Sequence, residues 1–276
     1  MTELKQPKIG LALGSGGAKG LAHIGVIKVL EDNNIPIDYI AGSSIGALIG
    51  GFYAATRDIT EIEQIALKTN WRQMLSLIDP SLRLGILDSE KVTYFIRSHV
   101  NNIHFKDLRI PLSVVATDLK SGEVISINEG ELASAIRASI SFPLVLEPVT
   151  REGKLLADGG LSLPVPVEAV RKMGAGIVIA VNLDADYFST DQNDNFGFYK
   201  FTKNSINILH HHLSFWSVKN ADIVISPKIG NVKWDKTLNG KSIILSGEQA
   251  TTKIFPQLLP LKKSKREESG KEVIGN

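Results

Sequence analysis

The 276-residue chain contains no cysteine, which excludes disulfides, zinc sites built on thiolates and a cysteine nucleophile. It also lacks an apolar run long enough to cross a bilayer, so any contact with a membrane would have to be peripheral. The polar N-terminus and the short apolar run that follows it predict no signal peptide. A formal net charge of only +2 provides no overall field that would attract nucleic acid. These absences predict a cytoplasmic protein, peripherally associated with membranes at most and without a nucleic-acid partner.

What is present is the composition of a globular protein, with 43% hydrophobic and 22% charged residues. We expect a single domain over residues 8–260, within which residues 52–110 form a helical cap region. Residues 261–276 are charged and poor in apolar side chains, so they predict a disordered tail.

A Gly-x-Ser-x-Gly pattern occurs at Gly42-Ser43-Ser44-Ile45-Gly46. The apolar residues 35–41 before it predict a buried strand, and Ala47 begins a predicted helix. Ser44 therefore lies where a strand turns into a helix, which is where a nucleophile elbow presents its serine. Gly42 and Gly46 supply the neighbours without side chains that such a sharp turn requires. The pattern alone also fits an ordinary tight turn, because three fixed residues in five recur by chance.

A glycine-rich loop follows a predicted buried strand at residues 9–13 and opens a predicted helix; its sequence is Gly14-Ser15-Gly16-Gly17-Ala18-Lys19-Gly20. Loops of this kind either hold a phosphate or direct backbone N–H groups at a developing oxyanion. A P-loop needs Ser or Thr after its lysine, and Ser15 or Lys19 breaks the dinucleotide-binding register, so the oxyanion role is favoured. The Lys19 side chain then either attracts a lipid phosphate or is solvated.

The order strand, helix, strand predicts a parallel sheet with right-handed crossovers.

Further along the chain, Trp71 and Leu75 belong to an apolar stretch that either guides acyl chains or packs in the core. Residues 111–117 and 124–127 predict a hairpin.

Asp158-Gly159-Gly160 ends a predicted strand at residues 154–157. Parallel sheets place their sites at the carboxyl ends of strands, so Asp158 is a candidate site residue, although the three residues alone also fit a turn. Three consecutive histidines, His210 to His212, lie in a helix predicted over residues 198–219. Consecutive residues face different sides of a helix, whereas chelation requires an i, i+4 spacing. A solvated or capping cluster is therefore favoured, and no metal site is predicted.

Taken in this order, the glycine loop, the serine elbow and the Asp-Gly-Gly sequence resemble the patatin-like phospholipase family, most of all its bacterial branch related to neuropathy target esterase. Further stretches agree, namely Ala22-His-Ile-Gly-Val-Ile, Ala116-Thr-Asp-Leu, Ala135-Ile-Arg-Ala-Ser-Ile-Ser, Pro164-Val-Pro-Val and Ala221-Asp-Ile-Val-Ile. The resemblance runs from about Lys8 to Leu259. It implies a three-layer α/β fold, with a mainly parallel central sheet and helices on both faces. It also implies activity on fatty-acyl esters without a metal or cofactor.

The same resemblance implies roles for individual residues. Ser44 would be the nucleophile and Asp158 the base of a Ser-Asp dyad. The oxyanion hole would be formed by the backbone N–H groups of Gly16, Gly17 and Ala18. The residues that support these motifs would be Gly14, Lys19, Gly20, Gly42, Gly46, Gly159 and Gly160. The chain departs from the family pattern at two positions: Ser15 stands where the glycine pattern begins, and Leu163 stands where asparagine is common before the Pro-Val-Pro-Val run.

The leading hypothesis is a lipid acyl hydrolase of the phospholipase A, lysophospholipase or esterase type, working through an acyl-enzyme. An acyltransferase would use the same acyl-enzyme. A catalytically weak regulatory or binding module is a third hypothesis, against which the presence of both Ser44 and Asp158 argues. A conventional triad needs a histidine after the acid in chain order, and only His210, His211 and His212 qualify.

Overall fold

The computed structural model describes residues 6–68, 89–100, 102–143, 145–185, 198–229 and 240–262. Trp71 and Leu75, which the sequence offers as acyl-chain residues, lie outside the described residues. So do residues 263–276, which make up most of the predicted tail. The described part of the predicted cap region contains the helices Ile59–Leu67 and Ser89–Val100, whereas residues 102–110 are mostly loop. The role of this region in guiding acyl chains stays a prediction.

An eight-stranded sheet runs through the centre of the described structure in the order β5-β6-β3-β2-β1-β7-β8, with β4 also paired to β3. The neighbours from β3 through β2, β1 and β7 to β8 are parallel, whereas β4 and β6 are antiparallel to β3, and β5 is antiparallel to β6. The mainly parallel sheet is confirmed, as is the hairpin of β3 and β4. The strands are β1 (Ile9–Leu13), β2 (Tyr39–Ser43), β3 (Leu112–Asp118), β4 (Val124–Ile127), β5 (Val149–Arg151), β6 (Lys154–Asp158), β7 (Ile177–Val181) and β8 (Ile223–Ile225).

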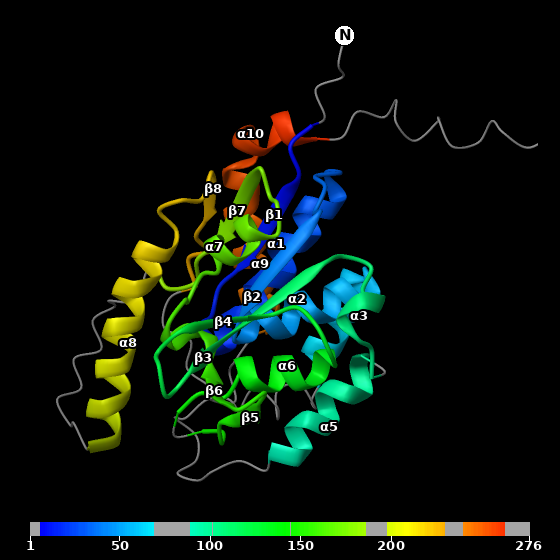
Figure 1. Ribbon diagram of the computed structural model, residues 1–276. Coiled ribbons are helices and arrows are strands. Elements are labelled where there is room, and N and C mark those ends of the chain that lie inside the picture. The colour runs from blue at the N-terminus through cyan, green and yellow to red at the C-terminus, as the bar shows by residue number, and fades with distance from the viewer. Residues whose placement is uncertain are drawn as a thin grey trace, which may run out of the picture.

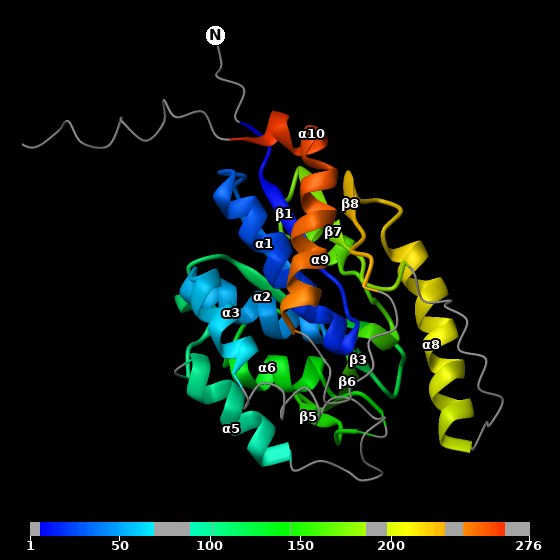
Figure 2. The same cartoon turned by 180° about the vertical axis from the view of Figure 1, so that it is seen from behind.

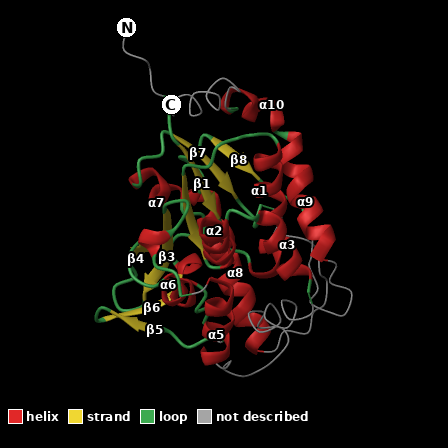
Figure 3. Cartoon of the chain, turned by 90° about the vertical axis from the view of Figure 1, so that its right-hand side faces the viewer, coloured by secondary structure: helices red, strands yellow, loops and turns green. Residues whose placement is uncertain are grey.

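Helices cover both faces of this sheet, which gives the three layers that the resemblance implies. Figures 1 and 2 show α1, α3 and α9 over one face and α7 over the other, and the side view in Figure 3 separates the layers. The α-helices are α1 (Ala22–Asp32), α2 (Ile45–Thr56), α3 (Ile59–Leu67), α5 (Ser89–Val100), α6 (Leu132–Ser139), α7 (Val167–Lys172), α8 (Phe198–Ser217), α9 (Gly240–Lys253) and α10 (Phe255–Leu258). Short 3-10 helices are η1 (Gly17–Leu21), η2 (Phe105–Asp107), η3 (Gly159–Leu161) and η4 (Leu259–Leu261).

The two faces of the sheet carry cores of unequal size, and β1 shows why. Its large side chains Ile9, Leu11 and Leu13 belong to the larger core, whereas Ala12 belongs to the smaller core under α7. Alternate residues of a strand face opposite sides, so one strand supplies both cores. The small residues let α7 lie close: a Cβ on Gly10 would be 2.6 Å from Val170 Cγ2.

Helices α1 and α9 cross with their backbones in close contact. A Cβ on Gly25 of α1 would lie 2.0 Å from the Ile244 carbonyl oxygen, and a Cβ on Gly247 of α9 would lie 2.1 Å from the Ala22 carbonyl oxygen. Neither position can accept a side chain without moving a helix.

One strand boundary differs from the prediction. Strand β2 starts at Tyr39 rather than Ile35, because its first partner in β1 is Gly10. The apolar residues Ile35 and Ile37 are buried all the same, as parts of the preceding loop. None of the described helices combines the length and apolar character needed to cross a bilayer.

Candidate active site

Ser44 occupies a sharp turn between β2 and α2. It is the N-cap residue of α2 and has φ 53° and ψ −123°, a conformation that residues with side chains rarely adopt. The flanking glycines are required by close packing, since a Cβ on Gly42 would lie 2.5 Å from Ala47 Cα, and one on Gly46 would lie 2.1 Å from the Leu13 carbonyl oxygen. The structure therefore has the strand, turn and helix that the serine pattern predicts.

The Ser44 hydroxyl donates a hydrogen bond to Asp158. Its Oγ lies 2.6 Å from Asp158 Oδ2, although the two residues are 114 positions apart in the chain. The other carboxylate oxygen, Oδ1, accepts from the Gly160 backbone N–H at 2.7 Å. Both side chains are buried, with exposed fractions of 6% for Ser44 and 2% for Asp158. A serine hydroxyl is thus held against a carboxylate that is itself fixed in orientation.

The route by which Asp158 reaches Ser44 differs from the prediction. The sequence argument places Asp158 on the rim formed by the carboxyl ends of parallel strands, and that argument is wrong because β6 is antiparallel to β3. Strand β3 pairs with β2 up to Val115 and with β6 from Ala116 onward. The carboxyl ends of β2 and β6 consequently meet, and the residues at these ends are Ser43 and Asp158.

Burial changes the acidity of Asp158. Loss of solvent raises the pKa of its carboxyl from the ordinary 3.8 to about 6, while the hydrogen bonds from Ser44 and Gly160 and the nearby His210 act in the opposite direction. At pH 7 a group with this pKa is ionised in about nine molecules of ten. The carboxylate can accept a proton, and it is a stronger base than an exposed aspartate.

Two hydroxyl groups that the sequence analysis missed support the backbone of the site. Ser139 Oγ accepts from the Ser44 backbone N–H at 2.8 Å and donates to the Val115 carbonyl at 2.6 Å. Thr117 Oγ1 donates to the Asp158 carbonyl at 2.8 Å. Both belong to stretches that agree with the resemblance, but Ser139 fits the end of an ordinary helix and Thr117 the end of an ordinary strand, so the sequence does not show which backbone groups they bind.

The glycine loop lies directly against the serine elbow. A Cβ on Gly20 would lie 2.1 Å from Ile45 Cγ1, and one on Gly46 would lie 2.8 Å from the Gly14 carbonyl oxygen. Gly17 has φ 56°, and a Cβ there would meet no atom within 4 Å, so the loop borders open space at this residue. Gly17 and Ala18 begin η1, and the first N–H groups of a helix have no partner within it. The loop thus places beside the turn that carries Ser44 amide groups that have no backbone partner among the described residues.

His23, the second residue of α1, is hydrogen-bonded to the glycine loop. It is fully buried, and its Nε2 donates to the Gly14 carbonyl at 2.7 Å, because a carbonyl can only accept. Burial lowers the pKa of His23 to about 4, so the ring is neutral at pH 7. Its Nδ1 has no hydrogen-bond partner among the described residues.

A partly buried polar cluster joins the glycine loop to helix α8. His210 Nε2 lies 2.7 Å from Ser15 Oγ, and His210 Nδ1 lies 2.8 Å from Asp184 Oδ2. The ammonium of Lys19 lies 3.4 Å from the other oxygen of Asp184. Burial raises the pKa of Asp184, but its hydrogen bond to His210 and the charges of His210 and Lys19 outweigh burial and hold that pKa below the ordinary value.

This cluster corrects the prediction of a solvated or capping histidine cluster. His210 faces inward because α8 is seated on Asp184 and the glycine loop, contacts that the helix sequence alone does not reveal. For Lys19 the sequence predicts either attraction to a lipid phosphate or a solvated side chain. Its ammonium instead pairs with Asp184. The cluster lies next to Asp158: a Cβ on Gly160 would be 2.8 Å from His210 Nε2, 2.9 Å from Ser15 Oγ and 3.0 Å from Asp158 Oδ1. The departure of Ser15 from the family pattern thus coincides with a specific contact.

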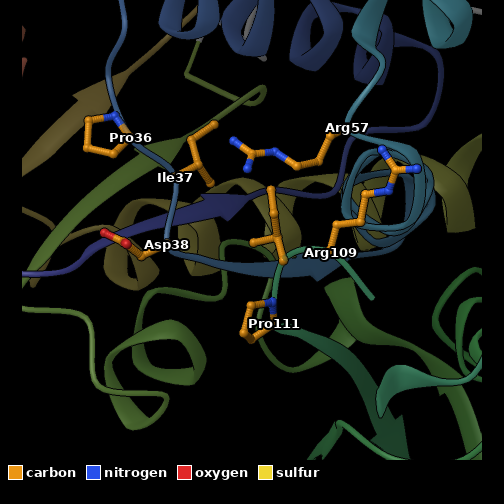
Figure 4. A pocket seen from close by; sticks show the side chains of 7 residues that line it. Pro36, Ile37, Asp38, Arg57, Arg109 and Pro111 are labelled. Carbon is orange, nitrogen blue, oxygen red and sulfur yellow. The ribbon is translucent and has the colours of Figure 1, made fainter. Parts of the chain in front are cut away.

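A separate pocket of about 190 Å³ lies beside the segment that leads into β2, at the opposite end of that strand from Ser44. Figure 4 shows that its two arginines, Arg57 and Arg109, direct their guanidinium groups away from each other, so they do not form a joint anion site. No group of three or more His, Cys, Asp or Glu side chains within the described ranges could hold a metal ion.

The chain also matches known proteins in sequence and in fold. Residues 11–171 match the family described as patatin-like phospholipase. The chain is 44% identical over 179 residues to an uncharacterized NTE family protein of Mycobacterium tuberculosis, a match that covers 64% of this chain and 49% of the relative. It is 34% identical over 191 residues to the lysophospholipase NTE1 of Yarrowia lipolytica, covering 67% of this chain and 13% of that protein.

Among solved structures, the crystal structure of VipD from Legionella pneumophila has a TM-score of 0.54 at 14% identity. That match covers 91% of this chain and 67% of the VipD chain, and it concerns the fold alone. The chain spans about half the length of its mycobacterial relatives and a smaller part of the yeast protein.

Proposed function

Because this chain belongs to the patatin-like phospholipase family, we propose that it is a lipid acyl hydrolase in which Ser44 is the nucleophile and Asp158 the base. The observation that carries the proposal is the 2.6 Å hydrogen bond from Ser44 Oγ to Asp158 Oδ2 at a strand-to-helix turn. A nucleophile and a base within hydrogen-bond reach, with the base oriented by a third group, are what covalent acyl transfer requires. The Gly160 N–H is that third group.

In the first half of the reaction, Ser44 Oγ attacks the carbonyl carbon of an ester while its proton passes to Asp158. The carbonyl oxygen becomes an oxyanion, which the backbone N–H groups of Gly16, Gly17 and Ala18 stabilise. Asp158 then gives the proton to the departing alcohol, leaving an acyl ester on Ser44. In the second half, water gives a proton to Asp158 and attacks this ester, and the proton returns to Ser44 as the fatty acid leaves.

A carboxylate is a weak base, so the oxyanion site has to contribute much of the rate. Each donor to an oxyanion is worth roughly 3 kcal/mol in other hydrolases. The raised pKa of Asp158 brings it closer to the pKa of the serine hydroxyl, which makes the proton transfer less unfavourable. The carboxyl of Asp158 is still mostly ionised at pH 7. The pairing of this base with the glycine loop supports a dyad that needs no histidine.

The test is mass spectrometry of the protein after incubation with a fluorophosphonate. We expect one adduct, on the tryptic peptide that contains Ser44. Ser44→Ala should remove the adduct, whereas the matched control Ser43→Ala should keep it, since the Ser43 hydroxyl is buried and makes no hydrogen bond within the described residues. A protein that stays unlabelled while folded would favour a regulatory or binding module on the same fold.

A further inference from the structure

Helix α8 is attached to the rest of the protein through polar groups. His210 contacts Ser15 and Asp184, and His211 Nδ1 donates to the Asp184 carbonyl at 2.7 Å. Ser214 is buried on the same side of the helix, with its Oγ 3.5 Å from Asp184 Oδ2. A helix on the surface of a globular protein ordinarily buries its apolar side, so this attachment is the reverse of the usual one.

The opposite side of α8 exposes large apolar side chains. Five of the eleven exposed large hydrophobic residues in the described structure belong to this one helix. They are Phe201, Ile208, Leu209, Phe215 and Trp216, with exposed fractions of 62%, 41%, 70%, 63% and 63%. Their spacings of seven and eight residues place them on one stripe, which we call the α8 stripe. Scattered apolar residues on a surface are normal, but large apolar side chains that recur on one side of a helix mark a surface that contacts something apolar.

The α8 stripe is long and lies at the side of the molecule. Fifteen residue steps separate Phe201 from Trp216, which at 1.5 Å per residue is roughly 22 Å of helix. Figures 1 and 2 show α8 (yellow) along one side of the described structure, beyond the edge strand β8. An elongated apolar stripe on a helix at the side of a protein fits a flat surface better than a small ligand.

The charge of the same segment indicates which surface this is. Residues 198–220 contain three lysines, three histidines and no acidic residue, although the whole chain has 29 acidic residues in 276. At the C-terminal end of the stripe, the ammonium of Lys219 lies 3.1 Å from the centre of the Trp216 ring. Tryptophan beside lysine is a combination found where helices meet the headgroup layer, and basic residues are attracted to anionic lipids.

We propose that the α8 stripe docks this protein on the surface of an anionic phospholipid bilayer. The inference rests on the proposed function, because a lipid hydrolase has to reach a substrate that is part of a bilayer. The inference adds the surface by which the protein reaches the bilayer. Since His210 contacts Ser15 of the glycine loop, the docked lipid would be separated from that loop by about one helix diameter, ~10 Å. The stripe would thus bring the bilayer and the Ser44 site together.

The test measures binding apart from catalysis. Ser44→Ala protein, which cannot consume lipid, is floated with vesicles of phosphatidylcholine containing 30 mol% phosphatidylglycerol, a composition chosen as roughly that of an anionic leaflet. We expect Leu209→Ser/Phe215→Ser to weaken vesicle binding by at least tenfold, since each exposed apolar side chain contributes on the order of tenfold when it is buried in lipid. The matched control Tyr94→Ser/Leu245→Ser, which removes two apolar side chains exposed by 74% and 48% on other helices, should bind as before.

A second readout locates the contact. Brominated phosphatidylcholine in the same vesicles should quench tryptophan fluorescence, and Trp216→Phe should lose much of that quenching while it still binds. Hydrolysis of a soluble short-chain ester by protein that retains Ser44 reports on the proposed function alone, and the stripe variant should keep it. Absence of that hydrolysis with vesicle binding intact would count against the hydrolase and not against the docking surface.

Three results would overturn the docking proposal. The first is vesicle binding by the stripe variant that equals that of its parent. The second is no vesicle binding by the parent. The third is a concentration-dependent dimer in light scattering that the stripe variant abolishes, because the stripe would then be occupied by a second copy of the chain.

Discussion

The buried position of Asp158 predicts that its carboxylate destabilises the fold at neutral pH and that Asp158→Asn relieves this cost. The pKa of the carboxyl is raised in the folded protein from 3.8 to about 6, so the unfolded chain releases this proton more readily than the folded one. Below pH 4 both states are protonated and the group has no net effect. As the pH rises from 4 to 6 the stability falls, and above pH 6 the whole penalty is present, ~3 kcal/mol for a shift of about two units.

Urea unfolding at several pH values measures this effect. Asp158→Asn keeps an acceptor for the Gly160 N–H and carries no charge, so we expect it to exceed the wild-type free energy of unfolding by ~3 kcal/mol at pH 8 and by about half as much at pH 5. The exposed Asp107→Asn serves as the control and should show no such trend. If Asp158→Asn were no more stable than wild type at pH 8, or if its advantage did not shrink toward low pH, the argument from burial would be refuted.

The remaining predictions concern turnover and the supporting hydroxyl. On a soluble ester, kcat/KM should fall about tenfold between pH 7 and pH 5, as the ionised fraction of Asp158 falls from ~90% to ~10%; a profile flat to pH 4.5 would contradict the raised pKa. His210→Gln should keep that acid limb and lose no more than about tenfold in kcat; a loss as complete as that of Asp158→Asn would instead favour a triad. Ser139→Ala should lower the free energy of unfolding by ~1–3 kcal/mol in urea, because it leaves the Ser44 N–H and the Val115 carbonyl without their partner; an unchanged midpoint would show that this hydrogen bond does not stabilise the fold.

The parts of the site that the sequence predicts are those whose geometry is local. The strand, turn and helix around Ser44 depend on residues 39–47, where glycines and an apolar run are direct signals. Asp158 could be identified as a candidate by the two glycines after it. Its approach to Ser44 depends on the pairing of β3 with both β2 and β6, and strand direction is a property of the whole sheet.

The cluster of Ser15, His210 and Asp184 shows what local patterns cannot reveal. Its members lie on two loops and a helix, and each has an ordinary explanation in its own segment. The only available signal is the serine that replaces a glycine in the loop, since a side chain placed in so crowded a turn needs a partner. In the sequence that serine is a departure from the pattern, and in the structure its Oγ lies 2.7 Å from His210 Nε2.

The crossing of α1 and α9 bears on when during synthesis the protein becomes active. Helix α1 continues from the glycine loop, and it is held in place by α9, whose backbone it touches at Gly25 and Gly247. Asp158 and Gly240 are 82 positions apart. At ribosomal rates of about 5–20 residues per second, a chain carries both Ser44 and Asp158 for roughly 4–16 s before α9 begins to be made. A growing chain would therefore contain Ser44 and Asp158 before α9 is present to hold α1, the helix that follows the glycine loop. On the proposed function, the site would therefore stay inactive until α9 has been synthesised.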